Sequence, residues 1–69
     1  MIQSKLIERK AFDNGSYVEL ESETDNGNTL YVICTYSEKS KKMDIAKLHE
    51  LPKAKAFFYK MVKFLELYD

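Results

Sequence analysis

The hydrophobic and polar positions of this chain follow two different periods. Residues 16–23 and 29–36 alternate between apolar and polar side chains and are rich in β-branched and aromatic residues, a pattern typical of β-strands. Residues 52–68 instead repeat apolar side chains every three or four positions, which is the spacing of an amphipathic helix. The pattern therefore predicts an α+β fold in which strands come first and a helix comes last.

Asn-Gly pairs precede both strands, at residues 14–15 and 26–27. Asn and Gly both tolerate the positive φ of a type I′ turn, so this pair is the strongest short signal for a hairpin. Two hairpins need three strands, and residues 2–12 supply the first one. We therefore expect a three-stranded antiparallel β-meander over residues 2–36.

The first turn suggests a register for the first two strands. If its Asn-Gly pair is a two-residue loop, Ala11 lies opposite Val18 and Lys10 lies opposite Glu19. The same register puts Arg9 on the apolar face of the sheet. A guanidinium there counts against this register unless Arg9 lies at the rim.

The second turn leaves the inward face of the third strand open. A two-residue loop would turn Tyr31 and Ile33 inward, whereas a three-residue loop would turn inward the set Leu30, Val32 and Cys34. In either case the strand has apolar side chains on both faces. One set must then lie on the face away from the helix.

The segment between the strands and the main helix is polar at first and then carries weak signals for a short helix. Residues 37–43 lack periodicity and predict a loop. Asp44 is a suitable N-cap for a short helix over residues 44–50, and Pro52 ends that helix because the residue before a proline is pushed out of the helical region. Pro52 also suits the first position of the main helix, over residues 52–68, where its missing N–H costs nothing.

The main helix gathers its apolar side chains in an arc of roughly 160°, wider than the stripe of about 100° that one packed face needs. The members of this arc are Ala54, Phe57, Phe58, Met61, Val62, Phe64, Leu65 and Tyr68. A helix about 10 Å wide covers only one face of a three-stranded sheet about 14 Å wide. We therefore expect the other face to be uncovered and to carry Tyr17 and Tyr36.

Size and composition narrow the classes of function. A chain of 69 residues forms one domain over residues 1–69, and a domain this small is marginally stable without a disulfide, a metal or another subunit. Its one cysteine cannot form an internal disulfide, so we expect a homodimer or another partner protein. Eleven basic and eleven acidic residues cancel, which argues against a general nucleic-acid or membrane-surface binder.

The N-terminus lacks the apolar core of a signal peptide, and no apolar run is long enough to span a membrane. A cytoplasmic location is the expectation that follows from the sequence.

Residues that could carry chemistry are sparse. The only histidine, His49, is fifteen positions from the only cysteine, Cys34, a spacing that matches no zinc site. Cys34 also lies within an apolar strand, where a thiol is not activated. The second strand carries alternating acidic residues, namely Glu19, Glu21, Glu23 and Asp25. We interpret them as a solvated face of the strand rather than a cation site. We therefore expect no enzyme, no metal, no cofactor and no small-molecule substrate.

The remaining hypothesis is a small protein-binding or regulatory protein, such as an inhibitor, that acts by occupying the surface of its partner. Its size and lack of chemistry suit an accessory protein of a bacterium or a phage. Interfaces are enriched in Tyr, Phe and Met, so we select a tyrosine and glutamate surface and the outer edge of the helix arc. The selected residues are Tyr17, Glu19, Glu21, Tyr36, Phe58 and Val62.

The alternative is a nucleic-acid-associated regulator that contacts phosphate through a lysine-rich loop and the polar face of the helix. Its candidate residues are Lys41, Lys42, Lys55, Lys60 and Lys63. The chain has a single arginine, which counts against specific recognition of bases.

Overall fold

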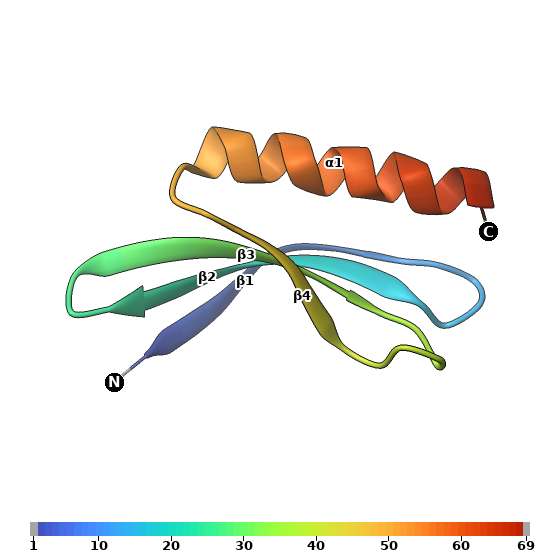
Figure 1. Ribbon diagram of the computed structural model, residues 1–69, viewed down its shortest axis with the longest axis horizontal. Helices are drawn as coiled ribbons and strands as arrows, with labels where there is room; N and C mark the ends of the chain where they lie inside the picture. The colour runs from blue at the N-terminus through green and yellow to red at the C-terminus, as the bar shows by residue number, and fades with distance from the viewer. Residues whose placement is uncertain (1, 69) are drawn as a thin grey trace.

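The computed structural model describes residues 2–68. Its elements are β1 (Gln3–Ala11), β2 (Tyr17–Asp25), β3 (Asn28–Tyr36), β4 (Met43–Leu48) and α1 (Leu51–Tyr68). The strands form one antiparallel sheet in the order β1-β2-β3-β4. The helix α1 lies along one face of this sheet and contacts mainly β2, β3 and β4 (Figure 1). The α+β class and the C-terminal helix are confirmed.

The sheet has four strands rather than the three that we predicted. The short helix predicted over residues 44–50 is also wrong, because most of that segment forms β4. Asp44 is not an N-cap but lies opposite Cys34 in the register of β3 and β4. The backbone groups on the outer edge of β3 need hydrogen-bond partners, and β4 supplies them. This long-range pairing overrides the local helical propensity of Ala46, Lys47 and Leu48.

The first hairpin is longer than the two-residue loop that we predicted. Ala11 pairs with Tyr17, and the N–H of Phe12 donates to the carbonyl of Ser16 at 2.9 Å. The N–H of Gly15 donates to the carbonyl of Phe12 at 3.0 Å. The loop therefore contains one more residue, and the register of β1 against β2 moves by one position.

This shift corrects the predicted pairs of the first two strands. Lys10 lies opposite Val18, and Arg9 lies opposite Glu19 on the face away from α1. The pairing of β1 with β2 is irregular between Leu6 and Glu8. This irregularity turns the side chain of Ile7 toward α1, where it packs against the core. The guanidinium of Arg9 is thus removed from the apolar face, which resolves the difficulty with the predicted register.

The second hairpin is the two-residue loop of the first alternative. Asn26 has φ 52° and Gly27 has φ 80°, the two positive values that a type I′ turn requires. Consequently Tyr31 and Ile33 turn toward α1 and belong to the core region.

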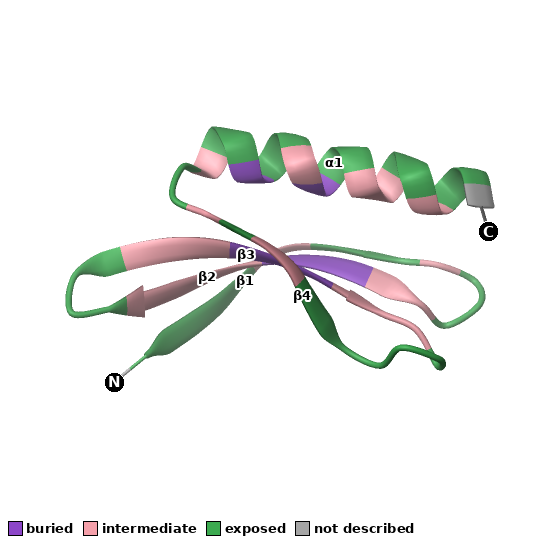
Figure 2. Ribbon diagram, viewed as in Figure 1, coloured by how far each residue is buried: buried purple, intermediate pink, exposed green. Residues whose placement is uncertain are grey.

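The core lies between α1 and the centre of the sheet, where Figure 2 shows the buried residues. Its fully buried members are Val18, Leu20, Ile33, Ala54 and Phe58. The small side chain of Ala54 allows α1 to approach the sheet closely, and Phe58 fills the space one turn later with 1% of its surface exposed.

The apolar arc of α1 is wider than the side of the helix that faces the sheet. Phe64 and Leu67 are 52% and 81% exposed, while Val62 is half-buried. The side chain of Tyr68, which we placed in the arc, lies outside the described residues, as do Met1 and Asp69 of the predicted domain. In the part of the chain that the structure describes, no helix has the length and apolarity needed to cross a membrane.

Candidate functional site

One face of the sheet is covered by α1, and no second helix or strand of residues 2–68 lies over the opposite face (Figure 1). We call this opposite side the open face. In β2 and β3 it carries the side chains that alternate with the core residues. These are Tyr17, Glu19, Glu21 and Glu23 in β2 and Leu30, Val32, Cys34 and Tyr36 in β3.

Three side chains from neighbouring strands stack at one end of the open face. The rings of Tyr17 and Tyr36 lie 5.0 Å apart with an interplanar angle of 13°, because the register pairs these residues directly. The Cζ atom of Arg9 lies 4.2 Å from the centroid of the Tyr17 ring. We call Arg9, Tyr17 and Tyr36 the aromatic column. Ring stacking contributes about 0.5–1.5 kcal/mol and an exposed cation–π contact about 0.5–1 kcal/mol, so the column is held in place before any partner binds.

An ionic cluster of Arg9, Glu19, Glu21 and Lys42 adjoins the column. The ammonium of Lys42 lies 3.2 Å from Glu21 Oε1 and 3.8 Å from Glu19 Oε1. The Nε atom of Arg9 lies 3.8 Å from Glu19 Oε2. The hydrogen bond to Glu21 raises the pKa of Lys42 above its ordinary value. Two positive and two negative groups cancel, so this part of the open face has no net charge.

Cys34 lies beneath the ionic cluster and is 1% exposed. Its thiol donates to Glu21 Oε1 at 3.3 Å. Burial, followed by the hydrogen bond to Glu21 and its charge, raises the pKa of Cys34 to about 12. Cys34 is therefore a protonated thiol at neutral pH, whereas a nucleophile or a metal ligand would need the thiolate.

Glu19, Glu21 and Cys34 place potential ligand atoms within 4.8 Å of one another. Lys42 provides the positive charge at this point, with its ammonium 3.2 Å from Glu21 Oε1 and 3.8 Å from Glu19 Oε1. The arrangement is accounted for by the salt bridges alone.

The structure divides the predicted partner-binding residues between two sides of the molecule. Tyr17, Glu19, Glu21 and Tyr36 meet on the open face as expected. Phe58 is a correction, because it faces the sheet and forms the centre of the core. Its position follows from how α1 is rotated about its axis, which the width of the arc did not determine. Val62 packs partly against the same core.

Sequence reasoning missed the contributions of Arg9 and Lys42 to the open face. The register that would have revealed Arg9 depended on the length of the first loop. Lys42 was assigned to phosphate contacts because it lies in a run of lysines. The available signal was that Lys42 directly precedes the alternating segment that forms β4. That segment was not recognised as a strand.

The predicted basic set is not gathered into one surface. Lys42 binds the glutamates of the open face, whereas Lys55, Lys60 and Lys63 are exposed on α1, which covers the opposite face of the sheet (Figure 1). Lys41 lies in the turn before β4 with φ 61°. His49 is exposed in the connection between β4 and α1.

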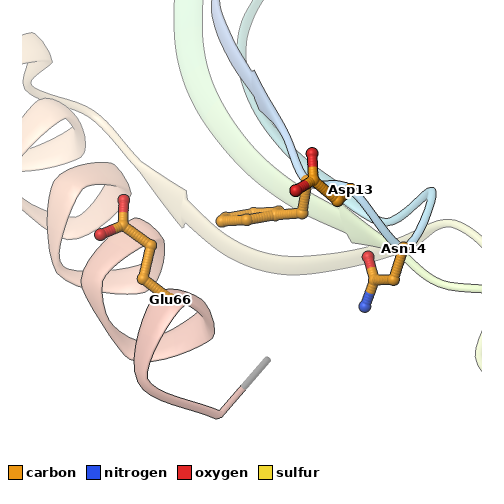
Figure 3. A pocket seen from close by; sticks show the side chains of 4 residues that line it. Asp13, Asn14 and Glu66 are labelled. Carbon is orange, nitrogen blue, oxygen red and sulfur yellow. The ribbon is translucent and has the colours of Figure 1, made fainter.

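The hollows on the surface are open to solvent rather than enclosed. One hollow of about 290 Å³ is lined by Phe12, Asp13, Asn14 and Glu66. Figure 3 shows Asp13 and Asn14 on the turn after β1 and Glu66 across from them on α1. A hollow of this kind, with two exposed carboxylates, provides no enclosed site for a small substrate.

No protein-family model matches this chain, and neither the curated proteins nor the solved structures include a match to it. The function is therefore inferred from the geometry of the open face.

Proposed function

We propose that this chain is a small non-enzymatic protein-binding protein that acts by occupying the surface of a partner protein. The observation that carries the proposal is the aromatic column of Arg9, Tyr17 and Tyr36 on a face that no other element of residues 2–68 covers.

Tyrosine and arginine are the residue types that most often dominate the binding energy of protein interfaces. Here their side chains are already ordered by stacking across three strands. A partner that binds them loses little side-chain entropy, which would otherwise oppose association. Buried Val32 and Cys34 form a rigid base for this surface.

The charge of the surface indicates the kind of partner. Arg9 and Lys42 cancel Glu19 and Glu21, so neither a polyanion nor a strongly basic tail is favoured. The surface fits a neutral, partly aromatic patch of a folded protein. Open hollows favour a macromolecular partner over a small molecule.

An accessory or inhibitor role in the cytoplasm of a bacterium, or in a phage, is the biological setting that we propose for this activity. It accords with the small size of the chain and with the protonated, buried state of Cys34.

The proposal is tested by substituting both tyrosines of the column. Partners are captured from the organism that encodes the protein, purified, and their Kd is measured with the wild type and with Tyr17→Ala/Tyr36→Ala. We expect the double variant to bind at least about tenfold more weakly, since residues that dominate an interface typically contribute more than 1 kcal/mol each. Tyr59→Ala is the matched control. Tyr59 is 48% exposed on α1, where its hydroxyl donates to Glu8 Oε1 at 2.9 Å and takes no part in the aromatic column, so a folded Tyr59→Ala variant should leave the Kd unchanged. An unchanged Kd in the double variant would show that the aromatic column is the wrong surface.

Salt dependence separates this proposal from the nucleic-acid alternative. A neutral protein interface should lose little affinity as salt rises from low to physiological concentration. Contacts to several phosphates would lower the affinity by roughly a thousandfold over that range. Such a steep loss, with nucleic acid in the captured complex, would replace the protein-binding proposal by the alternative.

A further inference from the structure

A second hollow lies at the opposite end of the open face from the aromatic column. It has a volume of about 370 Å³, and its lining is apolar at Ile2 and Leu30 and acidic at Glu23 and Asp25. Asn28 and Lys47 complete it. We call it the acidic hollow. Ile2 is 60% exposed, and the two carboxylates outnumber the single ammonium of Lys47, so the hollow offers apolar surface beside a rim whose net charge is negative.

The last turns of α1 have the opposite character. Phe64 and Leu67 are 52% and 81% exposed, and their spacing of three residues places them side by side on the helix surface. Lys60 and Lys63 lie four residues before them and flank them on the same side. We call these four residues the basic helix edge.

We propose that the basic helix edge of one copy docks in the acidic hollow of a second copy. Leu67 and Phe64 would cover Ile2 and Leu30. Lys60 and Lys63 would lie opposite Glu23 and Asp25. Each surface supplies the apolar contact and the charge that complement the other.

The fold requires this contact to be between two copies. The basic helix edge is on the element that covers one face of the sheet, and the acidic hollow is on the other face. One chain cannot join its own two surfaces. Because the two surfaces lie on opposite sides of the chain, a second copy seated in the hollow cannot also present its own hollow to the helix edge of the first, so the contact is head-to-tail rather than two-fold symmetric. Such a contact continues beyond a dimer as the protein concentration rises.

The contact is independent of the proposed partner site. Glu23 is six residues along β2 from Tyr17, which corresponds to roughly 20 Å. A second copy in the acidic hollow therefore leaves the aromatic column accessible.

Sedimentation velocity over a concentration series tests the inference with two charge-reversed variants. Lys60→Glu/Lys63→Glu and Glu23→Lys/Asp25→Lys should each remain monomeric at concentrations where the wild type associates, because each variant opposes like charges. A mixture of the two should associate again, because each then meets a surface of opposite charge. The interaction of the wild type should weaken as salt rises.

Two further variants make the result decisive. Lys53→Glu/Lys55→Glu changes the same charges at the other end of α1 and should associate like the wild type. Leu67→Ser alters a side chain that is 81% exposed, so it leaves the core intact, and it should weaken association at least tenfold. Circular dichroism checks that every variant is folded.

Three results would overturn the inference. They are a wild type that stays monomeric up to millimolar concentration, a control variant that dissociates as readily as Lys60→Glu/Lys63→Glu, and a mixture of the reversed variants that stays monomeric. None of these results bears on the binding of another protein to the aromatic column.

Discussion

At the scale of residues, the open face is organised by contacts that cross from strand to strand. Lys42 reaches two glutamates of β2 from the start of the segment that leads into β4. Cys34 donates to one of the same carboxylates from β3. These contacts give each of the two partly shielded carboxylates a cationic or hydrogen-bonding neighbour, which offsets the cost of removing it from water.

Replacing Lys42 should reveal how much this arrangement stabilises the fold. The side chains of Glu19 and Glu21 are only 11% and 20% exposed, so Lys42→Met leaves both without their shared ammonium. We expect the free energy of unfolding in urea to fall by about 1 kcal/mol. Lys41→Met changes the neighbouring exposed lysine and should stay within about 0.5 kcal/mol of the wild type. Equal stabilities of the two variants would contradict this role of Lys42.

The thiol of Cys34 should be unreactive in the folded protein. Its pKa is raised from an ordinary value of 9.0 to about 12, and its sulfur is buried. A thiol reagent at neutral pH should therefore modify Cys34 only in chains that have unfolded. Rapid modification of the folded protein would contradict the buried position.

The same pKa shift has a consequence for stability at high pH. Between about pH 9 and pH 12 the unfolded chain loses the thiol proton while the folded chain keeps it. The folded state then binds more protons, so the stability contributed by this group is complete below pH 9 and decreases as pH rises through that interval. The pKa values of Tyr59 and Lys42 are also raised, so both groups titrate at high pH. The difference in urea stability between the wild type and Cys34→Ala across this pH range isolates the contribution of the thiol.

At the scale of elements, α1 shows how the rotation of a helix decides which side chains are buried. Phe58 and Phe64 belong to the same apolar arc, yet Phe58 is 1% exposed and Phe64 is 52% exposed. A sheet contacts only one side of a helix, and the arc is wider than that side, so only the side chains nearest the sheet are enclosed.

Truncating these two phenylalanines should therefore have very different effects. Phe58→Ala should lower the free energy of unfolding by about 3–5 kcal/mol, enough to leave a domain of this size largely unfolded. Phe64→Ala should change it by less than about 1 kcal/mol. Urea denaturation followed by circular dichroism measures both. A large loss in Phe64→Ala would show that the helix packs with a different rotation.

The strands at the same scale show where local patterns succeed and where they fail. The turn at Asn26 and Gly27 follows its sequence signal directly. The first Asn-Gly pair instead belongs to a longer loop, because Phe12 pairs with Ser16 to close it. One additional loop residue reverses the face on which Arg9 lies.

At the scale of the whole molecule, one helix on a four-stranded sheet leaves the chain with two unlike sides. The open face carries the aromatic column and the neutral ionic cluster toward one end and the acidic hollow at the other. The exposed side of α1 carries lysines and the uncovered part of the apolar arc. This division is the reason that we assign partner binding and self-association to separate surfaces.

The sequence by itself determined the elements whose signals are local. The period of apolar residues predicted a helix over residues 52–68, observed as Leu51–Tyr68. Alternation and turn residues predicted the first three strands within about two residues at each end. The same alternation placed Tyr17 on the side opposite Val18 and Leu20, because the period of a strand assigns alternate side chains to opposite faces. The side of Tyr36 depended on the length of the second turn, which the sequence left open and the structure decided.

Only the tertiary structure decided the fourth strand, the register of the first hairpin, the burial of Phe58 and the contacts of Arg9 and Lys42. Each depends on atoms that are distant in the sequence. The segment Met43–Leu48 becomes a strand because β3 offers it an unpaired edge, and Phe58 is buried because α1 settles over β2 and β3. Local propensities are worth a few tenths of a kcal/mol per residue, so pairing and packing across the chain outweigh them.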